Sequence, residues 1–317
     1  MFLSLNATAQ ILSKEACGDT DIRKTNPVIK NSPKLVKHFS TPKDQDSIGW
    51  CYGFTAADLL TAEIGEPVSA FHVSALFNKK MRQNIFSRMG FGIKRLMKKP
   101  EFTEVYEGGF ARFSIDLARK NGGICREETL PFNADQRATH DLITELEFLK
   151  KHLKLLKNDA LLCAIVDNRL KAFDLSVDAS LLAESLINEN MNISLEKIAR
   201  EQCKNNLLKV PSFKTKKIFG SGKKFLKDFN AVLDRGRPIE VSYNVKPFID
   251  EDGVHSSLVT ARRWHAGKCQ YKIRNSWGKT CAFYNKKVIC EKESGSYWVN
   301  DEDFAKAHIS STYIVGK

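Results

Sequence analysis

The chain has 317 residues, 42% of them hydrophobic, and a formal net charge of +13 at pH 7. This length allows one two-lobed domain or two ordinary domains, and the hydrophobic content excludes disorder over most of the chain. No apolar run approaches the length of a membrane-spanning helix, so we expect no membrane span. The positive surface would suit an acidic partner. No motif of a nucleic-acid-binding module is present, so we expect no nucleic-acid partner.

The first forty residues are expected to form a leader, and two interpretations of it stay open. The Ala-Thr-Ala sequence ending at Ala9 has the small-x-small form of a signal cleavage site, which favours a remnant of an export signal and a periplasmic or secreted protein. However, the apolar stretch is short and no basic residues precede it, so an ordinary N-terminus of a cytoplasmic protein fits equally. Residues 10–40 are polar and predict an extended leader.

Cys51 opens an apolar run with helical spacing, which predicts a helix over 51–64 that ends at Gly65. Gln45 lies six residues before this cysteine. A cysteine thiolate can attack a carbonyl carbon, while a nearby side-chain amide and the backbone N–H of the cysteine hold the resulting oxyanion. A helix N-terminus also favours a thiolate. The alternative is that Cys51 is a buried packing residue, which is the commoner role of an isolated cysteine.

The middle of the chain is predicted to be mostly helical. Helices are expected over residues 73–89 and 110–121. From 140 to 209 the sequence is rich in Leu, Lys, Glu and Asn and has no Pro or Gly, which predicts several helices within an insertion at about 133–224. The Lys-rich stretches at 94–99 and 214–224 are expected to be solvated faces, with docking to an acidic surface as the alternative.

The last third of the chain is predicted to form an antiparallel sheet after a short helix over Leu226–Leu233. Five segments either alternate apolar and polar residues or are continuously apolar, as strands are: Arg237–Val245, Ser257–Arg263, Gln270–Arg274, Lys287–Glu291 and Tyr297–Val299. His255 and Asn275 lie beside two of these strands. A histidine can take the proton of a thiol, and an asparagine can orient that histidine.

The eight cysteines include no Cys-x-x-Cys pair, so we expect no metal site and no cofactor. If Cys51 is a nucleophile, an odd number of cysteines remains for disulfides. Two bridges are plausible hypotheses, one between Cys281 and Cys290 across a turn, and one between Cys163 and Cys203 within the insertion.

Three groups of residues together resemble the papain-like cysteine peptidases of the papain/cathepsin type, and we expect a divergent bacterial member. The first is Ile48-Gly-Trp-Cys51-Tyr52 with Gln45 before it, and the second is Asn275-Ser-Trp277-Gly278 after His255. The third comprises Glu107–Phe110, Lys120–Ile124 and Glu127–Phe132. The resemblance covers roughly 40–132 and 225–317 and leaves 133–224 uncovered.

The resemblance implies an α+β, papain-like two-lobed fold over 41–317, with a helical left lobe, an antiparallel β-rich right lobe and the helical insertion. It implies a monomeric endopeptidase that hydrolyses protein or peptide substrates through a Cys51 thiolate and His255 imidazolium. Asn275 would orient His255, Gln45 would serve the oxyanion hole, and Trp277 would cover the His–Asn bond. Substrate would be bound by Gly108, Gly109, Phe110, Ala111, Gly253, Ser256 and Trp277.

Some residues depart from the family pattern. Ile48 and Tyr106 stand where the family has a disulfide, Trp50 replaces a small residue, and Val254 precedes the histidine in place of Asp or Asn. Two other functions therefore stay open. One is a catalytically weak binding or scaffold protein, and the other is a different thiol acyl-transfer enzyme, such as an amidase or a transglutaminase-like crosslinker.

Overall fold

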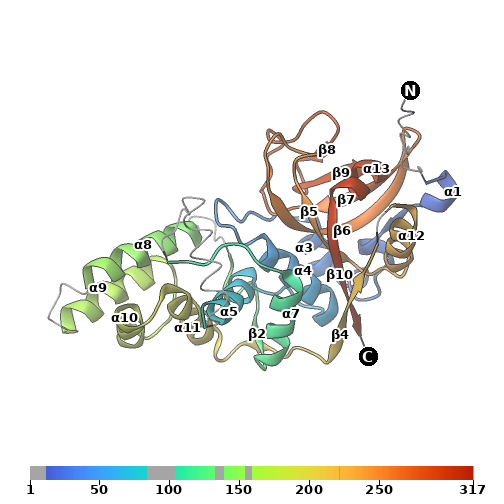
Figure 1. Ribbon diagram of the computed structural model, residues 1–317. Coiled ribbons are helices and arrows are strands. Elements are labelled where there is room, and N and C mark those ends of the chain that lie inside the picture. Colours follow the sequence, from blue (N-terminus) through green and yellow to red (C-terminus); the bar gives the residue numbers. More distant parts are fainter. Residues whose placement is uncertain (1–11, 84–103, 133–138, 154–158, 221, 317) are drawn as a thin grey trace. The chain divides into compact units, whose positions relative to one another are not determined.

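The computed structural model describes residues 12–83, 104–132, 139–153, 159–220 and 222–316 (Figure 1). The chain divides into two compact units. The helical unit is Asp44–Ser212, and the sheet unit combines Met1–Lys43 with Phe213–Lys317. Helices and antiparallel strands confirm the predicted α+β class. The expected signal remnant and the Lys-rich stretch at 94–99 lie outside the described residues.

The predicted helix that begins at Cys51 is confirmed at both ends. Helix α4 spans Cys51–Ile64, and Gly65 follows in the left-handed conformation at φ 86°, which a residue without Cβ adopts without strain. Most of its side chains are buried, because it packs against both α5 (Ala70–Gln83) and α7 (Ala111–Lys120). The other two predicted helices are therefore also present, apart from the end of the first, which lies outside the described residues.

The insertion predicted at about 133–224 is mainly helical in the described residues up to Ser212, which belong to the helical unit, but Phe213–Ile218 forms strand β4 of the sheet unit. It contains α8 (Thr139–Leu153), α9 (Asp159–Ala172), α10 (Ala179–Asn188) and α11 (Met191–Cys203). Helix α11 packs against α5, where the buried carboxylate of Glu196 pairs with Lys79 at 2.7 Å and with Arg200 at 2.6 Å. These contacts join the inserted helices to the helices that follow Cys51.

The hypothesis of a Cys163–Cys203 bridge is wrong. Cys203 forms a disulfide with Cys125 instead, and Cys163 lies on α9 outside the disulfides. The reason is the pairing of two short strands, β2 (Ile124–Cys125) and β3 (Leu207–Leu208), which brings the end of α11 beside Cys125. The predicted Cys281–Cys290 bridge is confirmed.

The sheet unit is built on an antiparallel sheet that has eight strands within the described ranges, in the order β4-β10-β5-β6-β7-β9-β8 with β1 paired to β6. The strands are β1 (Thr20–Asp21), β4 (Phe213–Ile218), β5 (Ile239–Asn244), β6 (Val254–His265), β7 (Lys268–Arg274), β8 (Ile289–Glu291), β9 (Ser296–Asn300) and β10 (His308–Gly316). The five predicted strands are present with shifted ends, whereas β1, β4 and β10 were not predicted.

Two helices contribute aromatic side chains to the core of the sheet unit. They are α12 (Gly222–Leu233), which was predicted, and α13 (Asp301–Ala307). Phe229 of α12 contacts Phe304 of α13, and both rings contact Tyr271 of β7, with centroids 4.7 to 5.6 Å apart. All three side chains are buried, so this cluster supplies apolar burial behind the middle of the sheet.

The prediction of an extended leader is wrong for residues 12–40, which fold as part of the sheet unit. They form α1 (Lys14–Cys17), β1, α2 (Ile22–Thr25) and α3 (Pro33–Ser40). Strand β1 pairs with β6, and Cys17 forms a disulfide with Cys269 of β7. Short elements that depend on such long-range partners leave little periodic signal in a polar sequence.

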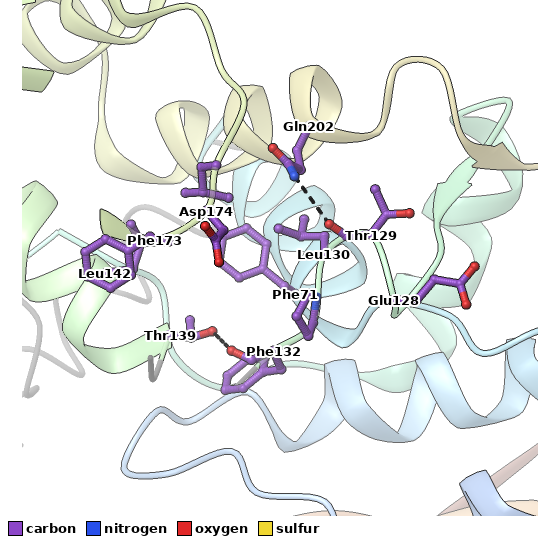
Figure 2. Close-up of a pocket in the computed structure, with 12 residues that line it drawn as sticks. Phe71, Glu128, Thr129, Leu130, Phe132, Thr139, Leu142, Phe173, Asp174 and Gln202 are labelled. Carbon is purple, nitrogen blue, oxygen red and sulfur yellow. Dashed lines mark hydrogen bonds between the residues drawn. The ribbon is translucent and has the colours of Figure 1, made fainter. Parts of the chain in front are cut away.

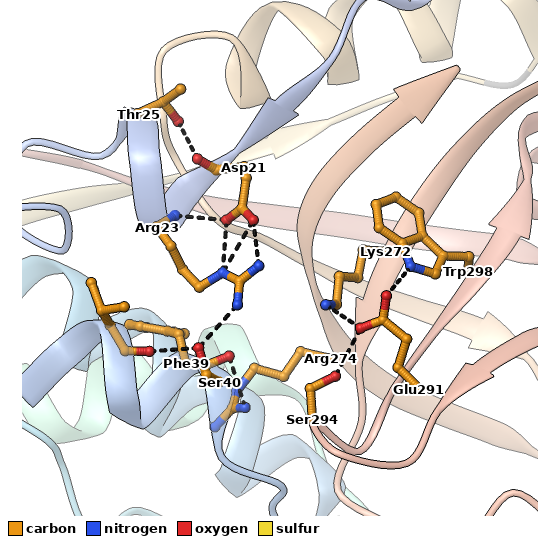
Figure 3. A network of polar contacts seen from close by, with 11 residues as sticks. Asp21, Arg23, Thr25, Phe39, Ser40, Lys272, Arg274, Glu291, Ser294 and Trp298 are labelled. Carbon is orange, nitrogen blue, oxygen red and sulfur yellow. Dashed lines mark hydrogen bonds and ion pairs between the residues drawn. The ribbon is translucent and has the colours of Figure 1, made fainter. Parts of the chain in front are cut away.

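A polar network joins this N-terminal segment to β7 (Figure 3). The buried guanidinium of Arg274 donates to the carbonyl oxygens at the end of α3, those of His38 at 3.0 Å, Phe39 at 3.3 Å and Thr41 at 2.7 Å. A cation suits a helix C-terminus, where carbonyl groups lack intrahelical donors. Arg274 therefore fixes the last residue of β7 against the N-terminal segment.

Across the described residues, none of the helices combines the length and the apolar character that crossing a membrane would require.

Replacing Cys17 and Cys269 together with alanine should destabilise the sheet unit by about 3 kcal/mol, because the bridge closes a very long loop in the unfolded chain. Urea unfolding followed by tryptophan fluorescence would measure the loss. Cys163→Ala is the matched control, since it removes a thiol that is in no disulfide. Equal midpoints for the double variant and the control would contradict the bridge.

Candidate active site

Cys51 is the first residue of α4 and is half-buried. The residue before it, Trp50, makes no side-chain capping hydrogen bond to the helix. Its indole is buried, and Nε1 donates to the carbonyl oxygen of Tyr106 at 3.0 Å. Cys51 belongs to none of the three disulfides. Its thiol therefore lies at the positive end of the helix dipole, a position that favours the thiolate.

Gln45 lies in the same unit and is buried in the loop that leads to Cys51. Its side-chain Nε2 donates to the carbonyl oxygen of Ile48 at 2.9 Å. This bond closes the turn between Gln45 and Ile48, so the amide is held beside the residues that immediately precede the helix.

The predicted glycine pair lies against the same loop. The backbone N–H of Gly108 donates to the carbonyl oxygen of Gly49 at 2.8 Å. At Gly109 an added Cβ would lie 2.7 Å from Phe77 and 2.9 Å from Tyr52, so only glycine fits between α4 and α5 at this point. Packing therefore accounts for Gly109 without a substrate.

The two residues after the pair differ in exposure. Phe110 is 58% exposed and precedes α7, whereas Ala111 is buried as the first residue of that helix. A role for either residue in binding substrate stays a prediction, and the exposed phenyl ring of Phe110 is the better placed of the two to meet a ligand.

In the sheet unit, the structure brings His255 and Asn275 together. His255 is the second residue of β6 and Asn275 directly follows β7, its neighbour in the sheet. The His255 Nε2 atom lies 2.7 Å from Asn275 Oδ1. The ring of Trp277 contacts the imidazole with centroids 4.4 Å apart. His265, the other histidine of β6, is exposed at the opposite end of the strand.

Hydrogen bonds around Asn275 determine which nitrogen of His255 carries a hydrogen. Asn275 Oδ1 accepts from the backbone N–H of Ser276 at 2.9 Å and from the hydroxyl of Ser257 at 3.3 Å. A backbone N–H can only donate, so the atom that it meets must be the amide oxygen. The same oxygen faces His255, which must therefore donate from Nε2. In the neutral imidazole, Nδ1 then holds the lone pair.

Burial dominates the acid–base behaviour of His255. It is 5% exposed, and desolvation lowers its pKa to about 4, against a smaller opposing effect of the bond to Asn275. The ring is therefore neutral at pH 7, in the form that can accept a proton on Nδ1.

The other predicted substrate-binding residues of the sheet unit lie around His255. Ser256 is buried, and its hydroxyl lies 3.4 Å from a carboxylate oxygen of Glu240, whose pKa burial raises to about 7. Side chains alternate along a strand, so Ser256 and His255 point to opposite faces of β6. Val254 is 69% exposed, and Gly253 precedes it. Contact of Gly253 or Ser256 with substrate stays a prediction.

The sequence analysis missed three polar residues near the histidine. Ser257 lies two positions after His255, so strand alternation alone could have placed it on the same face. Glu240 has no such signal, because it depends on the register between β5 and β6. Tyr284, whose hydroxyl accepts from Asn275 Nδ2 at 2.7 Å, lies in the Cys281–Cys290 hairpin and carries no motif of its own.

A separate cavity of about 420 Å³ lies in the helical unit (Figure 2). Phe71 of α5 and Leu142 of α8 line its apolar part, and Asp174 and Gln202 contribute polar groups. The chain between two further lining residues, Phe132 and Thr139, lies outside the described residues, so we assign no ligand to this cavity. Among the described residues, no group of three or more His, Cys, Asp or Glu side chains could hold a metal ion.

No family model matches the sequence, and no curated protein matches it either. Solved structures similar to this one include digestive procathepsin L 3 of Tenebrio molitor, with 11% identity over 99% of this chain and 73% of that chain and a TM-score of 0.47. Bromelain from Ananas comosus is 11% identical over 94% of this chain and 99% of its own, with a TM-score of 0.46. The proform of the ragweed pollen cysteine protease Amb a 11 is 13% identical over 100% of this chain and 69% of its own, with a TM-score of 0.46. Likeness at this level carries no argument about activity.

Acidification should destabilise a Cys51→Ala protein partly through His255. Its folded pKa of about 4 lies below the ordinary 6.5, so the unfolded chain binds this proton first. The contribution of His255 to the free energy of unfolding is complete above pH 6.5. It should fall by up to about 3 kcal/mol as the pH approaches 4. Adding His255→Gln should flatten the fall in urea midpoint over this range.

The matched control is His265→Gln in the same background, because that histidine is exposed on the same strand. We expect it to leave the slope of stability against pH unchanged. Parallel curves for the His255→Gln variant and its parent would show that His255 is not buried in its neutral form.

Proposed function

We propose that the protein is a cysteine peptidase that hydrolyses peptide bonds in protein or peptide substrates by papain-like chemistry. The observation that carries the proposal is the 2.7 Å contact between His255 Nε2 and Asn275 Oδ1, buried against Trp277. It joins two residues that the sequence motif selects as general base and orienting residue. Cys51, at the start of α4, is the nucleophile that the same motif selects.

In the proposed reaction, Cys51 transfers its thiol proton to His255 Nδ1, and the thiolate attacks the carbonyl carbon of the scissile bond. The oxyanion is stabilised by the Gln45 side-chain amide and the backbone N–H of Cys51. The imidazolium then protonates the leaving amine, and an acyl–Cys51 thioester remains. Water gives a proton to His255 as its oxygen attacks the thioester, and the carboxylic acid product leaves as the thiol is regenerated.

The low pKa of His255 agrees with this scheme if the imidazolium forms only opposite a thiolate. Burial opposes a lone charge, but a negative sulfur nearby would raise the pKa of the ring, because the two charges stabilise each other. Asn275 contributes in the same direction, since its oxygen accepts a stronger, charge-assisted hydrogen bond from the protonated ring than from the neutral one. The charge on His255 would thus depend on Cys51.

The disulfides support an exported location, which we propose as periplasmic or secreted. Three bridges connect described residues, one of them between the N-terminal segment and β7. Structural disulfides form and persist in oxidising compartments and are rare in the cytosol.

A peptidyl-epoxide inhibitor of thiol proteases should add once to the wild-type protein, at Cys51. Intact mass and peptide mapping would locate the adduct. Cys51→Ala should give none, and His255→Ala should slow labelling at least about a hundredfold, because the thiol loses its base. Cys163→Ala is the matched control, because it removes the other cysteine outside the disulfides and should label at the wild-type rate.

The same experiment separates the proposed function from its alternatives. A folded wild-type protein that takes no adduct would favour a binding or scaffold protein. An adduct at Cys51, together with transfer of the acyl group to added amines in preference to water, would favour a transglutaminase-like crosslinking enzyme, and hydrolysis of small amides without cleavage of peptides would favour an amidase.

A further inference from the structure

The amide nitrogen of Asn275 donates to the phenolic oxygen of Tyr284 at 2.7 Å. We propose that Tyr284 is a positioning residue that holds the Asn275 amide with its oxygen toward His255. The role in catalysis rests on the proposed function, whereas the orientation of the amide does not.

The oxygen of the Asn275 amide needs hydrogen-bond donors, whereas its nitrogen needs an acceptor. The oxygen accepts from His255 Nε2, Ser276 N–H and Ser257 Oγ. The nitrogen has two hydrogens and needs an acceptor, because an unpaired amide N–H in a buried place is costly. The Tyr284 oxygen supplies this acceptor on the side away from His255. A rotated amide would place its N–H groups against the donors His255 and Ser276, so the phenol selects the productive orientation.

The hairpin that carries Tyr284 is fixed at several points. The Cys281–Cys290 disulfide closes it, and Tyr284 itself forms an isolated β-bridge with Ile249. The next residue, Asn285, is also held by hydrogen bonds. Its backbone N–H donates to the carbonyl oxygen of Phe248 at 2.9 Å, and its side chain donates to the carbonyl oxygen of Pro247 at 2.9 Å. The phenol is therefore anchored independently of Asn275.

The Tyr284 ring also packs against the aromatic residues of the site. It stacks on Trp277 with centroids 6.1 Å apart and contacts Tyr297 at 4.6 Å. Trp277 in turn lies on the imidazole of His255. A phenylalanine at this position would keep both ring contacts and lose only the hydroxyl, which makes Tyr284→Phe a selective test.

The groups that face this pair are neutral at ordinary pH. Burial raises the pKa of Tyr284 and of Tyr297, so both phenols keep their hydrogens. Tyr243 also lies against His255, edge to face with centroids 5.8 Å apart, and its hydroxyl bonds to Ser257 and Tyr297. A change in the pH dependence of the Tyr284→Phe variant would therefore report on His255 and Cys51 and not on ionisation of a phenol.

Without the phenolic oxygen, the amide of Asn275 should lose its fixed orientation and stabilise the His255 imidazolium less well. In Tyr284→Phe we expect kcat/KM at pH 7 to fall about tenfold and the alkaline limb of its pH profile to move about one unit lower, with KM unchanged. The limb moves to lower pH because it follows loss of the imidazolium proton.

Tyr271→Phe is the matched control. Tyr271 is also buried in the sheet unit, and its hydroxyl donates to an asparagine oxygen, Asn230 Oδ1, at 2.7 Å. This variant loses a comparable buried hydrogen bond away from His255, so its unfolding midpoint should fall while its pH profile stays at the wild-type position.

A measurement that needs no activity tests the orientation directly. Nitrogen-15 NMR of labelled histidine reports which ring nitrogen carries the hydrogen. In a Cys51→Ala background, where the ring is neutral, we expect His255 as the Nε2–H tautomer with or without Tyr271→Phe, and a mixture of tautomers with Tyr284→Phe. The double variant Cys281→Ser, Cys290→Ser keeps the phenol but loosens the hairpin, and it should shift both readouts in the same direction.

An unchanged tautomer and an unchanged alkaline limb in Tyr284→Phe would overturn the proposal and leave the hydroxyl with a purely structural role. If Tyr284→Phe does not fold, the disulfide variant decides in its place by the same two readouts. A wild-type protein without thiol reactivity would refute the proposed function instead, and the tautomer measurement would still decide whether Tyr284 orients Asn275.

Discussion

The candidate site of the sheet unit depends on the hydrogen bonds that the buried guanidinium of Arg274 makes. It donates to three carbonyl oxygens at the end of α3, and it is the residue directly before Asn275. A buried cation is tolerated only where its hydrogen bonds are made, so the N-terminal segment and the end of β7 must form together. The residue that hydrogen-bonds to His255, Asn275, thus directly follows a residue that is held by the N-terminal segment.

In the helical unit, the loop that leads to Cys51 is held in place by hydrogen bonds and not by a disulfide. The loop before Cys51 and the loop before α7 are joined by two hydrogen bonds, from Trp50 Nε1 to Tyr106 and from Gly108 to Gly49. The resemblance suggested a disulfide at this point in related sequences, where this chain has Ile48 and Tyr106. The indole of Trp50 is buried, so its N–H has a strong requirement for a partner. A tryptophan can therefore fix the loop in place of a bridge.

The sequence predicted features with local signals and missed those that depend on distant partners. The ends of α4 follow from helical spacing and Gly65, and the insertion from a long stretch without Pro or Gly. Pairing of His255 with Asn275 followed from a motif that brackets two neighbouring strands. The folded segment 12–40 and the Cys125–Cys203 bridge depend on contacts across 78 to 252 residues, which no local pattern encodes. The roles of Cys51 and Gln45 stay predictions.

The two faces of strand β6 near His255 differ in electrostatic character. On one face, the partners of the histidine and its asparagine are serine and tyrosine hydroxyls, which orient the ring without a permanent charge. On the other face, Ser256 lies against the buried carboxyl of Glu240. A carboxylate bonded to His255 would raise its pKa by stabilising the imidazolium. Neutral partners leave the charge of the ring to depend on the groups that it meets in the proposed reaction, in which His255 first takes a proton and then releases it.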